Sequence, residues 1–497
     1  MRFGLALAFG ALLPLSLAPF DLWPLGAVSV AGWFYLLYRE PSRCWLLGWF
    51  YGVGKYAVGA SWIYVSINRF GNAPPPLAAF LVVLFVAGLA LFPLLNAWLF
   101  QRLRNGRPLA DGLLFTTLLV GFEWLLTWVL TGFPWLFVGY AHLDTVLGNL
   151  APLGSVLLVS FALTLSAVML VVVFLTADVR IRSTAVLLAV LPWLAGWVGG
   201  LPVWVEDSAR REVALIQGNV DQASKWLPES RGPIYRRYLR LTEGHWDADL
   251  VIWPEAAITF MAHEATQILG QLDTKGETNG SALVLGLPAL EQVPHGDVVF
   301  RNTAVALGVG SGRYVKRRLV PFGEYVPLED LLRGLIEFFD LPMSRSEPGS
   351  WHQPLLDIGG PRAAMAICYE VVYPGLVREQ ARQSDVLLTI SNDTWFGRSF
   401  GPLQHQQMAR MRALENGRWM LRGTNNGVTA IIDHTGQVRA SLPRFQEGAL
   451  RGEFALMTGL TPFARFGQAP VLGLLLAMLG VLVYRRFRSS VPATAGA

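Results

Sequence analysis

Charge and cysteine are scarce in this sequence. Charged residues make up 15% of its 497 positions, whereas soluble proteins average about 25%, and they are especially sparse before residue 205. The hydrophobic share is 53% and the mean hydropathy is +0.42. Only two cysteines, Cys44 and Cys368, are present, which excludes a framework of several disulfides. This composition argues against a wholly soluble protein.

The signatures of nucleotide and metal binding are also missing. No GxGxxG or GxxxxGK[ST] motif stands between a strand and a helix, and the seven histidines are scattered without the spacing of metal ligands. The net charge is +5, but the arginines stand in short clusters beside apolar runs, as in membrane proteins rather than nucleic-acid binders. We therefore expect no cofactor, no metal and no nucleic-acid partner.

Long apolar runs dominate the first 204 residues. The first run could be a signal peptide, but it lacks a small-residue cleavage site and a second run follows at once, so we interpret it as a retained helix. Each run is long enough to cross a hydrocarbon core of about 30 Å. The runs cover residues 3–20, 22–38, 44–65, 77–100, 112–131, 152–176, 184–204 and 468–484.

Basic residues alternate between the short connections. One set of connections is basic, whereas the other carries only Arg69, and the positive-inside rule places the basic set and both termini in the cytoplasm. Seven crossings of the bacterial inner membrane then place residues 206–465 on its outer side, in the periplasm. This topology puts Cys44 and Cys368 on opposite sides of the membrane. The basic set contains Arg39, Arg43, Arg102, Arg104, Arg107, Arg180, Arg182, Arg485, Arg486 and Arg488.

The exterior stretch alternates short strands and helices, which predicts an α/β domain with a largely buried sheet. The chain then divides into a seven-helix transmembrane domain (1–204), a periplasmic catalytic domain (205–466), a C-terminal transmembrane helix (467–485) and a cytoplasmic tail (486–497). The predicted strands are Glu212–Gln217, Asp249–Trp253, Ala282–Gly286, Thr303–Leu307, Ala363–Cys368, Val386–Ser391 and Thr429–Asp433. The predicted helices are Ile234–Glu243, Tyr373–Gln383 and Leu403–Asn416.

Three chemically active residues follow apolar strands. Cys368 ends the run Ala363–Cys368, where a buried, inert cysteine is the alternative interpretation. Glu255 comes just after a second strand, and Lys316 and Glu324 come after a third. Together they supply the parts for acyl transfer: a carboxylate to take the thiol proton, an ammonium to stabilise the oxyanion, and a cysteine to carry the acyl group.

Around these residues the sequence resembles a known family. Trp253-Pro254-Glu255, Lys316 ahead of Leu319–Pro327, and Cys368-Tyr369-Glu370 are similar to the Glu-Lys-Cys triad of the nitrilase superfamily. The membrane half narrows the resemblance to the bacterial apolipoprotein N-acyltransferases. Further motifs that carry it are Glu123-Trp124, Thr131–Trp135, Gln217–Asn219, Ser391–Gly397 and Thr424–Gly427.

The resemblance implies a fold and a reaction. The fold would be a multi-pass α-helical membrane domain with an exterior α/β nitrilase-like domain, an αββα sandwich. The reaction would move an acyl chain from a membrane phospholipid to Cys368 as a thioester, and then to the amino group of a diacylglyceryl-cysteine apolipoprotein. Glu255 would be the general base, Lys316 the oxyanion stabiliser and Cys368 the nucleophile. Supporting positions would be Glu324, Tyr369, Glu370 and Trp226, with a merely packed aromatic as the alternative for Trp226.

Two other functions stay open at this point. A membrane-tethered amidase would use the same triad with water as the acceptor, although its soluble substrates need no elaborate membrane domain. A transporter with a periplasmic binding domain could use Lys55 and Glu123, which lie about 16 Å into their helices. We expect these two residues to face each other or to share a polar cavity. We also expect Asp330–Phe339 to form an amphipathic lid.

Overall fold

The computed structural model describes residues 1–292, 298–325 and 346–489. The predicted lid, Asp330–Phe339, lies outside these residues. The chain forms two compact units. The first comprises Met1–Ser61, Ala79–Pro202 and the chain from Phe466, and the second comprises Trp62–Ala78 and Val203–Arg465.

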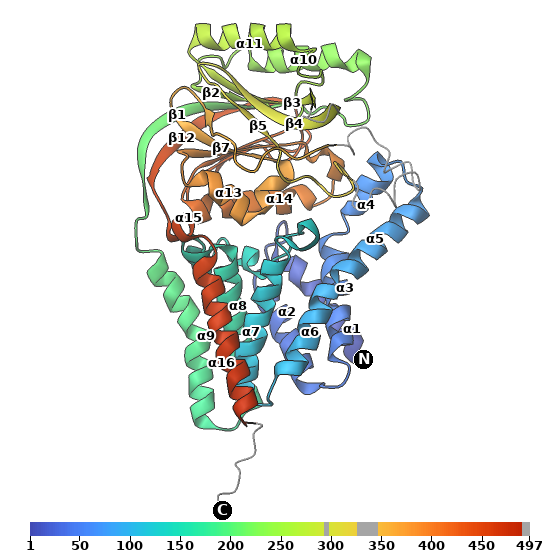
Figure 1. Ribbon diagram of the computed structural model, residues 1–497, viewed down its shortest axis with the longest axis vertical. Helices are drawn as coiled ribbons and strands as arrows, with labels where there is room; N and C mark the ends of the chain where they lie inside the picture. Colours follow the sequence, from blue (N-terminus) through green and yellow to red (C-terminus); the bar gives the residue numbers. More distant parts are fainter. Residues whose placement is uncertain (293–297, 326–345, 490–497) are drawn as a thin grey trace, which may run out of the picture. The chain divides into compact units, whose positions relative to one another are not determined.

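The first unit is a helical bundle (Figure 1). Its C-terminal helix α16 packs against α7 and α8, which joins the last apolar run to the earlier ones. Three short 3₁₀ segments lie between α7 and α8. The helices are α1 (Arg2–Leu12), α2 (Pro24–Arg39), α3 (Cys44–Gly59), α5 (Pro75–Leu89), α6 (Leu91–Leu103), α7 (Pro108–Leu125), α8 (Ala151–Leu175), α9 (Val179–Gly199) and α16 (Ala469–Ser489).

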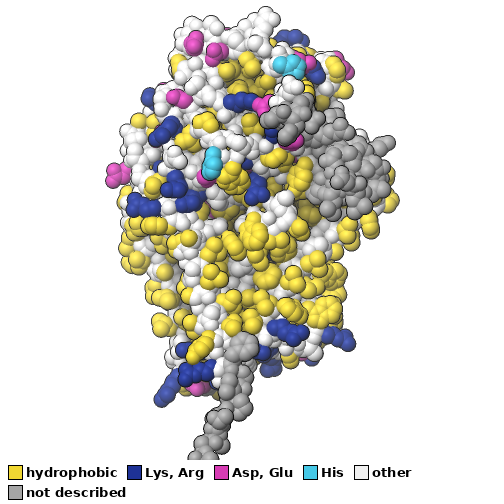
Figure 2. Space-filling model, viewed as in Figure 1, with side chains coloured by type: hydrophobic (Ala, Val, Ile, Leu, Met, Phe, Trp, Pro, Cys, Tyr) yellow, Lys and Arg dark blue, Asp and Glu magenta, His cyan; other side chains and the backbone are white. Residues whose placement is uncertain are grey.

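Several of these helices can cross a membrane. Among the described residues, five helical segments are long and apolar enough: Pro75–Leu103, Pro108–Leu125, Val146–Leu175, Val179–Gly199 and Ala469–Arg486. Helices α1, α2 and α3 are shorter, with 11, 16 and 16 residues. In Figure 2 the surface of this unit is largely hydrophobic, and Lys and Arg side chains gather at its lower end. The protein is therefore a membrane protein.

Small residues bring α1 and α3 into close contact. A Cβ atom at Gly10 would lie 2.0 Å from the carbonyl oxygen of Tyr51, and one at Gly54 would lie 2.0 Å from that of Leu7. The two backbones thus approach more closely than any larger side chain permits. This is the usual way in which transmembrane helices gain packing energy, because lipid supplies no hydrophobic drive between them.

The predicted cytoplasmic connections converge at one end of the helical unit. The Arg104 guanidinium donates hydrogen bonds to the carbonyl oxygens of Leu37 (3.2 Å) and Tyr38 (3.0 Å). Arg486, near the end of α16, contacts the Arg104 carbonyl. The ends of α2, α6 and α16 therefore lie together, as an alternating topology requires.

Lys55 and Glu123 line one small cavity within the bundle, with a volume of about 30 Å³. They form no ion pair in the described part of the chain. The Glu123 carboxylate instead accepts a hydrogen bond from the Val138 amide (2.7 Å), and its second oxygen has no partner among the described residues. The predicted direct pairing is absent, whereas the predicted shared cavity is present and is large enough for a water molecule.

The second unit contains two six-stranded sheets in the described part of the chain. The first has the order β12-β1-β2-β3-β4-β5 and the second β11-β10-β9-β8-β7-β6, with parallel pairing only at the centres, β1-β2-β3 and β7-β8-β9. The strands of the first sheet are β1 (Val205–Gln217), β2 (Leu250–Ile252), β3 (Ala282–Gln292), β4 (Val298–Gly308), β5 (Arg313–Val315) and β12 (Gly448–Gly459). Those of the second are β6 (Leu356–Asp357), β7 (Arg362–Ile367), β8 (Val386–Ser391), β9 (Met420–Thr424), β10 (Ala430–Ile432) and β11 (Val438–Ser441).

Helices cover the outer faces of both sheets. Helices α10 (Pro228–Thr242) and α11 (Thr266–Asn279) lie on the first sheet, and α13 (Pro374–Ala381) and α14 (Gly401–Asn416) on the second (Figure 1). Alternate residues of one strand serve the two faces: Val213 and Leu215 enter the core between the sheets, whereas Ala214 and Ile216 pack under the helices. The predicted αββα sandwich is confirmed, with both faces of the central strands buried.

The strand predictions are correct at the centre of each sheet and incomplete at its edges. All seven predicted strands are present, and Val386–Ser391 has the predicted bounds. Strand β1 begins at Val205 rather than at Glu212, because its first half pairs with β12 although most of its side chains are exposed. The prediction missed helix α11 and strands β5, β6, β9, β11 and β12, several of which are very short or lack an apolar run.

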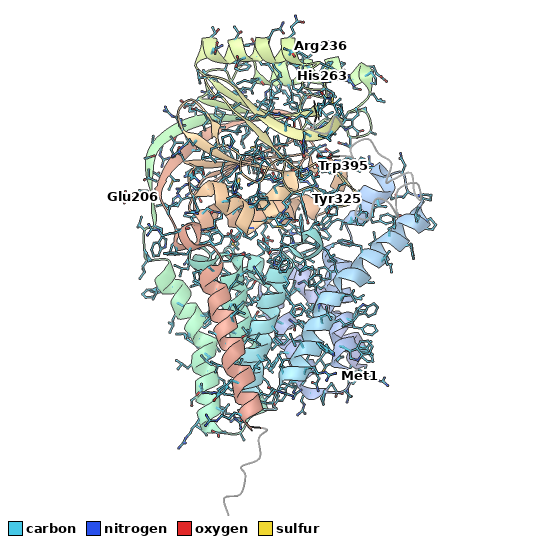
Figure 3. The ribbon with its side chains drawn as sticks, viewed as in Figure 1. Met1, Glu206, Arg236, His263, Tyr325 and Trp395 are labelled. Carbon is cyan, nitrogen blue, oxygen red and sulfur yellow. The ribbon has the colours of Figure 1, made fainter. Side chains whose placement is uncertain are left out.

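One short segment of the helical half folds with the sandwich. Trp62–Ala78 belongs to the second unit, although the sequence analysis assigned it to the domain 1–204. The Trp62 indole nitrogen donates to the Gln404 amide oxygen (3.2 Å), and its ring packs edge-on against Phe396 (4.8 Å). The Ser66 hydroxyl donates to the main-chain carbonyl of Trp395 (2.8 Å), which is labelled in Figure 3.

Candidate active site

The three predicted catalytic residues follow three strands of the sandwich. Glu255 comes after β2, Lys316 directly after β5, and Cys368 directly after β7, so that both sheets contribute. The Lys316 ammonium lies 3.4 Å from the Glu255 carboxylate. The Cys368 thiol is within electrostatic range of both groups. The sandwich therefore brings together residues that are separated by more than a hundred positions in the sequence.

Lys316 is held by two carboxylates. Its ammonium donates to Glu324 Oε1 (2.8 Å) as well as to Glu255 Oε1 (3.4 Å), and it is almost fully buried. The second oxygen of Glu324 accepts a hydrogen bond from the Val320 amide (2.8 Å). Glu324 thus holds the ammonium from one side and the Val320 amide from the other.

Glu255 is oriented by two asparagines. The side-chain amide of Asn302 donates to Glu255 Oε1 (2.7 Å), and the main-chain amide of Asn392 donates to Oε2 (2.8 Å). The Asn302 amide also reaches Glu324 Oε1 (3.1 Å), so it links the two carboxylates. Asn302 could not be recognised from the sequence, because an isolated asparagine within a strand carries no pattern of its own.

Cys368 sits on a sharp turn between β7 and a 3₁₀ segment, Cys368–Val372. Its φ is +53°, a left-handed conformation that residues other than glycine seldom adopt and that costs on the order of 1–3 kcal/mol. The thiol sulfur lies 3.5 Å from the Ser391 hydroxyl oxygen, and the side chain is partly exposed. This turn presents the thiol at the end of the strand, as the sequence predicts.

Glu370 ties the cysteine turn to the lysine strand. Its Oε2 accepts a hydrogen bond from the Ile367 amide (2.8 Å), just before the cysteine. Its Oε1 accepts from the amide of Arg317 (2.7 Å), just after Lys316, and the Tyr314 hydroxyl donates its one hydrogen toward the carboxylate, 3.0 Å from each oxygen. Glu370 thus links the main chain before Cys368 to the main chain after Lys316.

Tyr369 and Trp226 differ in their surroundings. The Tyr369 and Tyr373 hydroxyls share a hydrogen bond, and the two rings pack edge to face at 5.3 Å. Trp226 lies in the loop between β1 and α10 next to Lys225, whose ammonium donates to the main-chain carbonyl of Glu255 (3.3 Å). The buried Lys225 could not be recognised from the sequence, since nothing there distinguishes it from a surface lysine.

The charges in the site have opposite effects on the lysine and the cysteine. Burial by itself lowers the pKa of Lys316, but the carboxylates of Glu324 and Glu255 raise it above its usual value of 10.5. Burial and the Glu255 carboxylate raise the pKa of the Cys368 thiol above 9.0, and Lys316 opposes them only in part. At neutral pH the ammonium is therefore charged and the thiol protonated, so that the thiol needs a base in order to react.

No cluster of histidine, cysteine, aspartate or glutamate side chains suitable for a metal ion occurs among the described residues. A thiol, a carboxylate beside it and a charged ammonium are the groups that acyl transfer through a thioester requires.

Comparisons with known families cover both units. Residues 9–169 match the family described as the apolipoprotein N-acyltransferase N-terminal domain, and residues 212–459 match the family described as carbon-nitrogen hydrolase. Named relatives extend over nearly the whole chain. An apolipoprotein N-acyltransferase of Azotobacter vinelandii is 48% identical, with 99% of this chain and 96% of the relative covered. Proteins of the same name from Pseudomonas aeruginosa PAO1 (45% identical; 97% and 96% covered) and Vibrio cholerae (39%; 94% and 94%) also match.

Solved structures resemble part of the chain. The Caenorhabditis elegans NitFhit protein is 14% identical, with 54% of this chain and 65% of that chain covered and a TM-score of 0.39. Saccharomyces cerevisiae Nit3, of the nitrilase superfamily, is 18% identical, with 58% and 96% covered and a TM-score of 0.37. The full-length relatives, rather than these partial matches, bear on what the chain does.

Proposed function

The chain belongs to the apolipoprotein N-acyltransferase family and is a membrane enzyme of lipoprotein N-acylation, and on that premise we propose that it works through an acyl thioester on Cys368. The donor is a membrane phospholipid and the acceptor is the free amino group of a diacylglyceryl-cysteine apolipoprotein. The observation that carries the proposal is the convergence of a protonated thiol, the Glu255 carboxylate and the charged Lys316 at the strand ends.

In the first half-reaction Glu255 takes the thiol proton as the sulfur attacks an ester carbonyl carbon of the phospholipid. The carbon–sulfur bond forms while the carbonyl oxygen gains negative charge, which the Lys316 ammonium stabilises. The tetrahedral intermediate then expels the alkoxide of the lysophospholipid, and Glu255 returns the proton to it. Because the carboxylate is already held by Asn302 and Asn392, little rearrangement accompanies these proton transfers.

In the second half-reaction the lipoprotein amine attacks the thioester carbon. Glu255 takes a proton from the amine, and Lys316 again stabilises the oxyanion. Collapse of this intermediate forms the amide bond and releases Cys368, which recovers its proton. The two half-reactions thus share one site and one base, which is the logic of a ping-pong mechanism.

A lipid donor and a lipid-anchored acceptor account for the helical unit. Both substrates lie in a bilayer, so an enzyme that spans it has access to them without extracting either lipid. We place residues 205–466 in the periplasm and the termini in the cytoplasm, with the C-terminal transmembrane helix at 467–485. The clustered arginines near Arg104 and Arg486 support this orientation, because basic ends favour the cytoplasm.

Mass spectrometry of the intact protein tests the proposal directly. The purified enzyme is incubated with phospholipid vesicles that carry one known acyl chain. We expect a mass increase equal to that acyl group on Cys368, its removal by hydroxylamine, and its loss when a synthetic diacylglyceryl peptide with a free amine is added. Absence of the adduct under conditions that support N-acylation, or an adduct elsewhere, would contradict the mechanism. Acetylating the peptide amine provides the matched control.

A further inference from the structure

A buried polar network contacts the main-chain carbonyl of Cys368. It is separate from Glu255 and Lys316, which act on the thiol. The Nε2 atom of His405, on α14, lies 3.0 Å from the Cys368 carbonyl oxygen. The imidazole is almost fully buried, as are the side chains of Asp393 and Arg422 that surround its other nitrogen. None of the residues in this network belongs to the catalytic triad, so its role requires a separate explanation.

The position of the imidazole proton follows from its neighbours. A carbonyl oxygen only accepts, so the Nε2 atom that faces the Cys368 carbonyl carries a hydrogen. The other nitrogen, Nδ1, lies between the Arg422 Nη2 donor (3.0 Å) and the Asp393 Oδ1 acceptor (3.1 Å). Burial and the Arg422 charge lower the pKa of His405, and Asp393 opposes them only in part. The imidazole is therefore neutral with its hydrogen on Nε2, from which it donates to the Cys368 carbonyl.

Arg422 favours this tautomer, because its guanidinium donates toward Nδ1, whereas the Asp393 carboxylate contacts both groups. Arg422 Nη2 also donates to Asp393 Oδ2 (2.8 Å), so one nitrogen bridges the carboxylate and the imidazole. Burial by itself raises the pKa of Asp393, but Arg422 and His405 lower it below its usual value, and the carboxylate stays charged. A Cβ atom at Gly427 would lie only 2.3 Å from Asp393 Oδ2, which shows how tightly the chain closes over this group.

The same network reaches the thiol side of the cysteine. The Ser391 hydroxyl has one hydrogen, and the Asp393 carboxylate at 2.5 Å is a stronger acceptor than the Cys368 sulfur at 3.5 Å. Ser391 therefore donates to Asp393, and its oxygen is left facing the sulfur. Asp393 thus connects to Cys368 through two routes: His405 to the carbonyl and Ser391 to the thiol.

We propose that His405 is a positioning residue that holds the left-handed turn at Cys368 through its Nε2–H hydrogen bond to the cysteine carbonyl. Arg422, which is itself held by Asp393, keeps Nδ1 as the acceptor. The inference rests on the proposed role of Cys368 as the nucleophile. A strained φ persists only where the surroundings determine it, and this hydrogen bond acts on the strained peptide itself. His405 touches no reacting atom, so it affects how often the thiol is correctly placed and not how the proton moves.

The test compares two amide replacements of similar polarity. The side-chain nitrogen of glutamine in His405→Gln can occupy the place of Nε2 and donate to the carbonyl, whereas His405→Asn reaches only the place of Nδ1. His405→Leu removes the donor altogether. His142→Leu is the matched control, because His142 is also buried but lies in the helical unit with Thr145 as its partner. For each variant we would measure the rate of thioester formation on Cys368, its dependence on phospholipid concentration, and the thermal midpoint in detergent.

We expect His405→Asn and His405→Leu to slow thioester formation by about 100-fold at saturating phospholipid, the cost of a nucleophile misplaced by about 1 Å. His405→Gln should stay within about tenfold of the wild type, and the KM for phospholipid should change little in all three. The pH at which the rate is half-maximal should not move, because the imidazole exchanges no proton. His142→Leu should lower only the thermal midpoint.

Two results would overturn the proposal. One is a folded His405→Leu or His405→Asn variant that forms the thioester at nearly the wild-type rate. The other is an equal loss in the glutamine and asparagine variants with equal thermal midpoints, since the donor reaching the carbonyl would then be irrelevant. If the wild type itself forms no adduct on Cys368, the proposed function fails instead, and the two failures are therefore distinguishable.

Discussion

The buried ammonium of Lys225 donates a hydrogen bond to the main-chain carbonyl of Glu255, 3.3 Å away. Burial lowers the pKa of this lysine to about 8, although the Glu255 carboxylate partly opposes the shift. In the unfolded chain the pKa of a lysine is near 10.5. Between pH 8 and pH 10.5 the unfolded state therefore binds more protons than the folded state. The stability contribution of Lys225 therefore rises as the pH increases from 8 to 10.5.

Lys225→Met should stabilise the protein at neutral pH but not at high pH. At pH 7 the wild type must bury a charged lysine, so the variant should gain up to about 3 kcal/mol relative to the wild type. This difference should shrink steadily as the pH is raised toward 10. Thermal unfolding in detergent at several pH values measures it, with Lys275→Met, at a half-buried lysine paired with Glu243, as the control for adding a methionine. A difference that stays constant from pH 7 to 10 would contradict the prediction.

The two cysteines should behave oppositely. Cys368→Ala should abolish N-acylation while leaving the protein folded, and Cys368→Ser should be nearly inactive, because a hydroxyl has a much higher pKa than a thiol and Glu255 cannot deprotonate it effectively. Cys44→Ala should retain activity, since Cys44 lies in the helical unit. Acyl transfer to a synthetic lipopeptide measures all three. Substantial activity in Cys368→Ala would refute the assignment of the nucleophile.

Glu255→Gln should block formation of the thioester and not only its breakdown. The glutamine can still accept the hydrogen bond from the Asn392 amide, so the site should keep its shape while losing its base. We expect a loss of at least about 100-fold in the rate of adduct formation, the usual contribution of a general base. Glu324→Gln is the informative comparison, because it keeps a partner for Lys316 without touching the base, and it should cost less. Normal adduct levels with slow turnover in Glu255→Gln would restrict this residue to the second half-reaction.

Lys55 and Glu123 should be energetically coupled through the cavity that they share. Lys55→Met and Glu123→Gln should each lower the thermal midpoint and the free energy of unfolding. The double variant should lose about 1 kcal/mol less free energy of unfolding than the sum of the two single losses. The reason is that each single variant leaves one polar group in the cavity without its counterpart. A double-mutant cycle in detergent measures the coupling, and strict additivity would show that the two groups are satisfied independently.

The sequence predicted the triad because each member follows an apolar strand and stands in a distinctive motif. It also predicted β8 completely, since six consecutive buried residues leave a clear pattern. It did not predict β9, in which the buried Arg422 interrupts the apolar run. Only the folded sandwich shows that this arginine is matched by Asp393, which lies in a different part of the chain.

The residues that orient the triad were harder to find than the triad itself. Asn302, Lys225 and His405 are single polar residues within ordinary stretches of the chain. Each contacts a residue 30 to 47 positions away, and two of these contacts are made to main-chain carbonyls. Local periodicity reports which face of an element is buried, but it does not report what a buried polar atom will meet. Contacts of that kind become predictable only once the two sheets are placed face to face.

The contact between Trp62 and Gln404 spans 342 positions of the chain. At a synthesis rate of about 5–20 residues per second, the tryptophan leaves the ribosome roughly 20 to 70 s before its partner exists. During that interval Trp62 lacks Gln404 and Phe396, the residues that it contacts in the folded protein. The sandwich is therefore among the last parts of the protein to be completed during biosynthesis. A fragment that begins at Val203 would lack Trp62–Ala78, which belongs to the same unit.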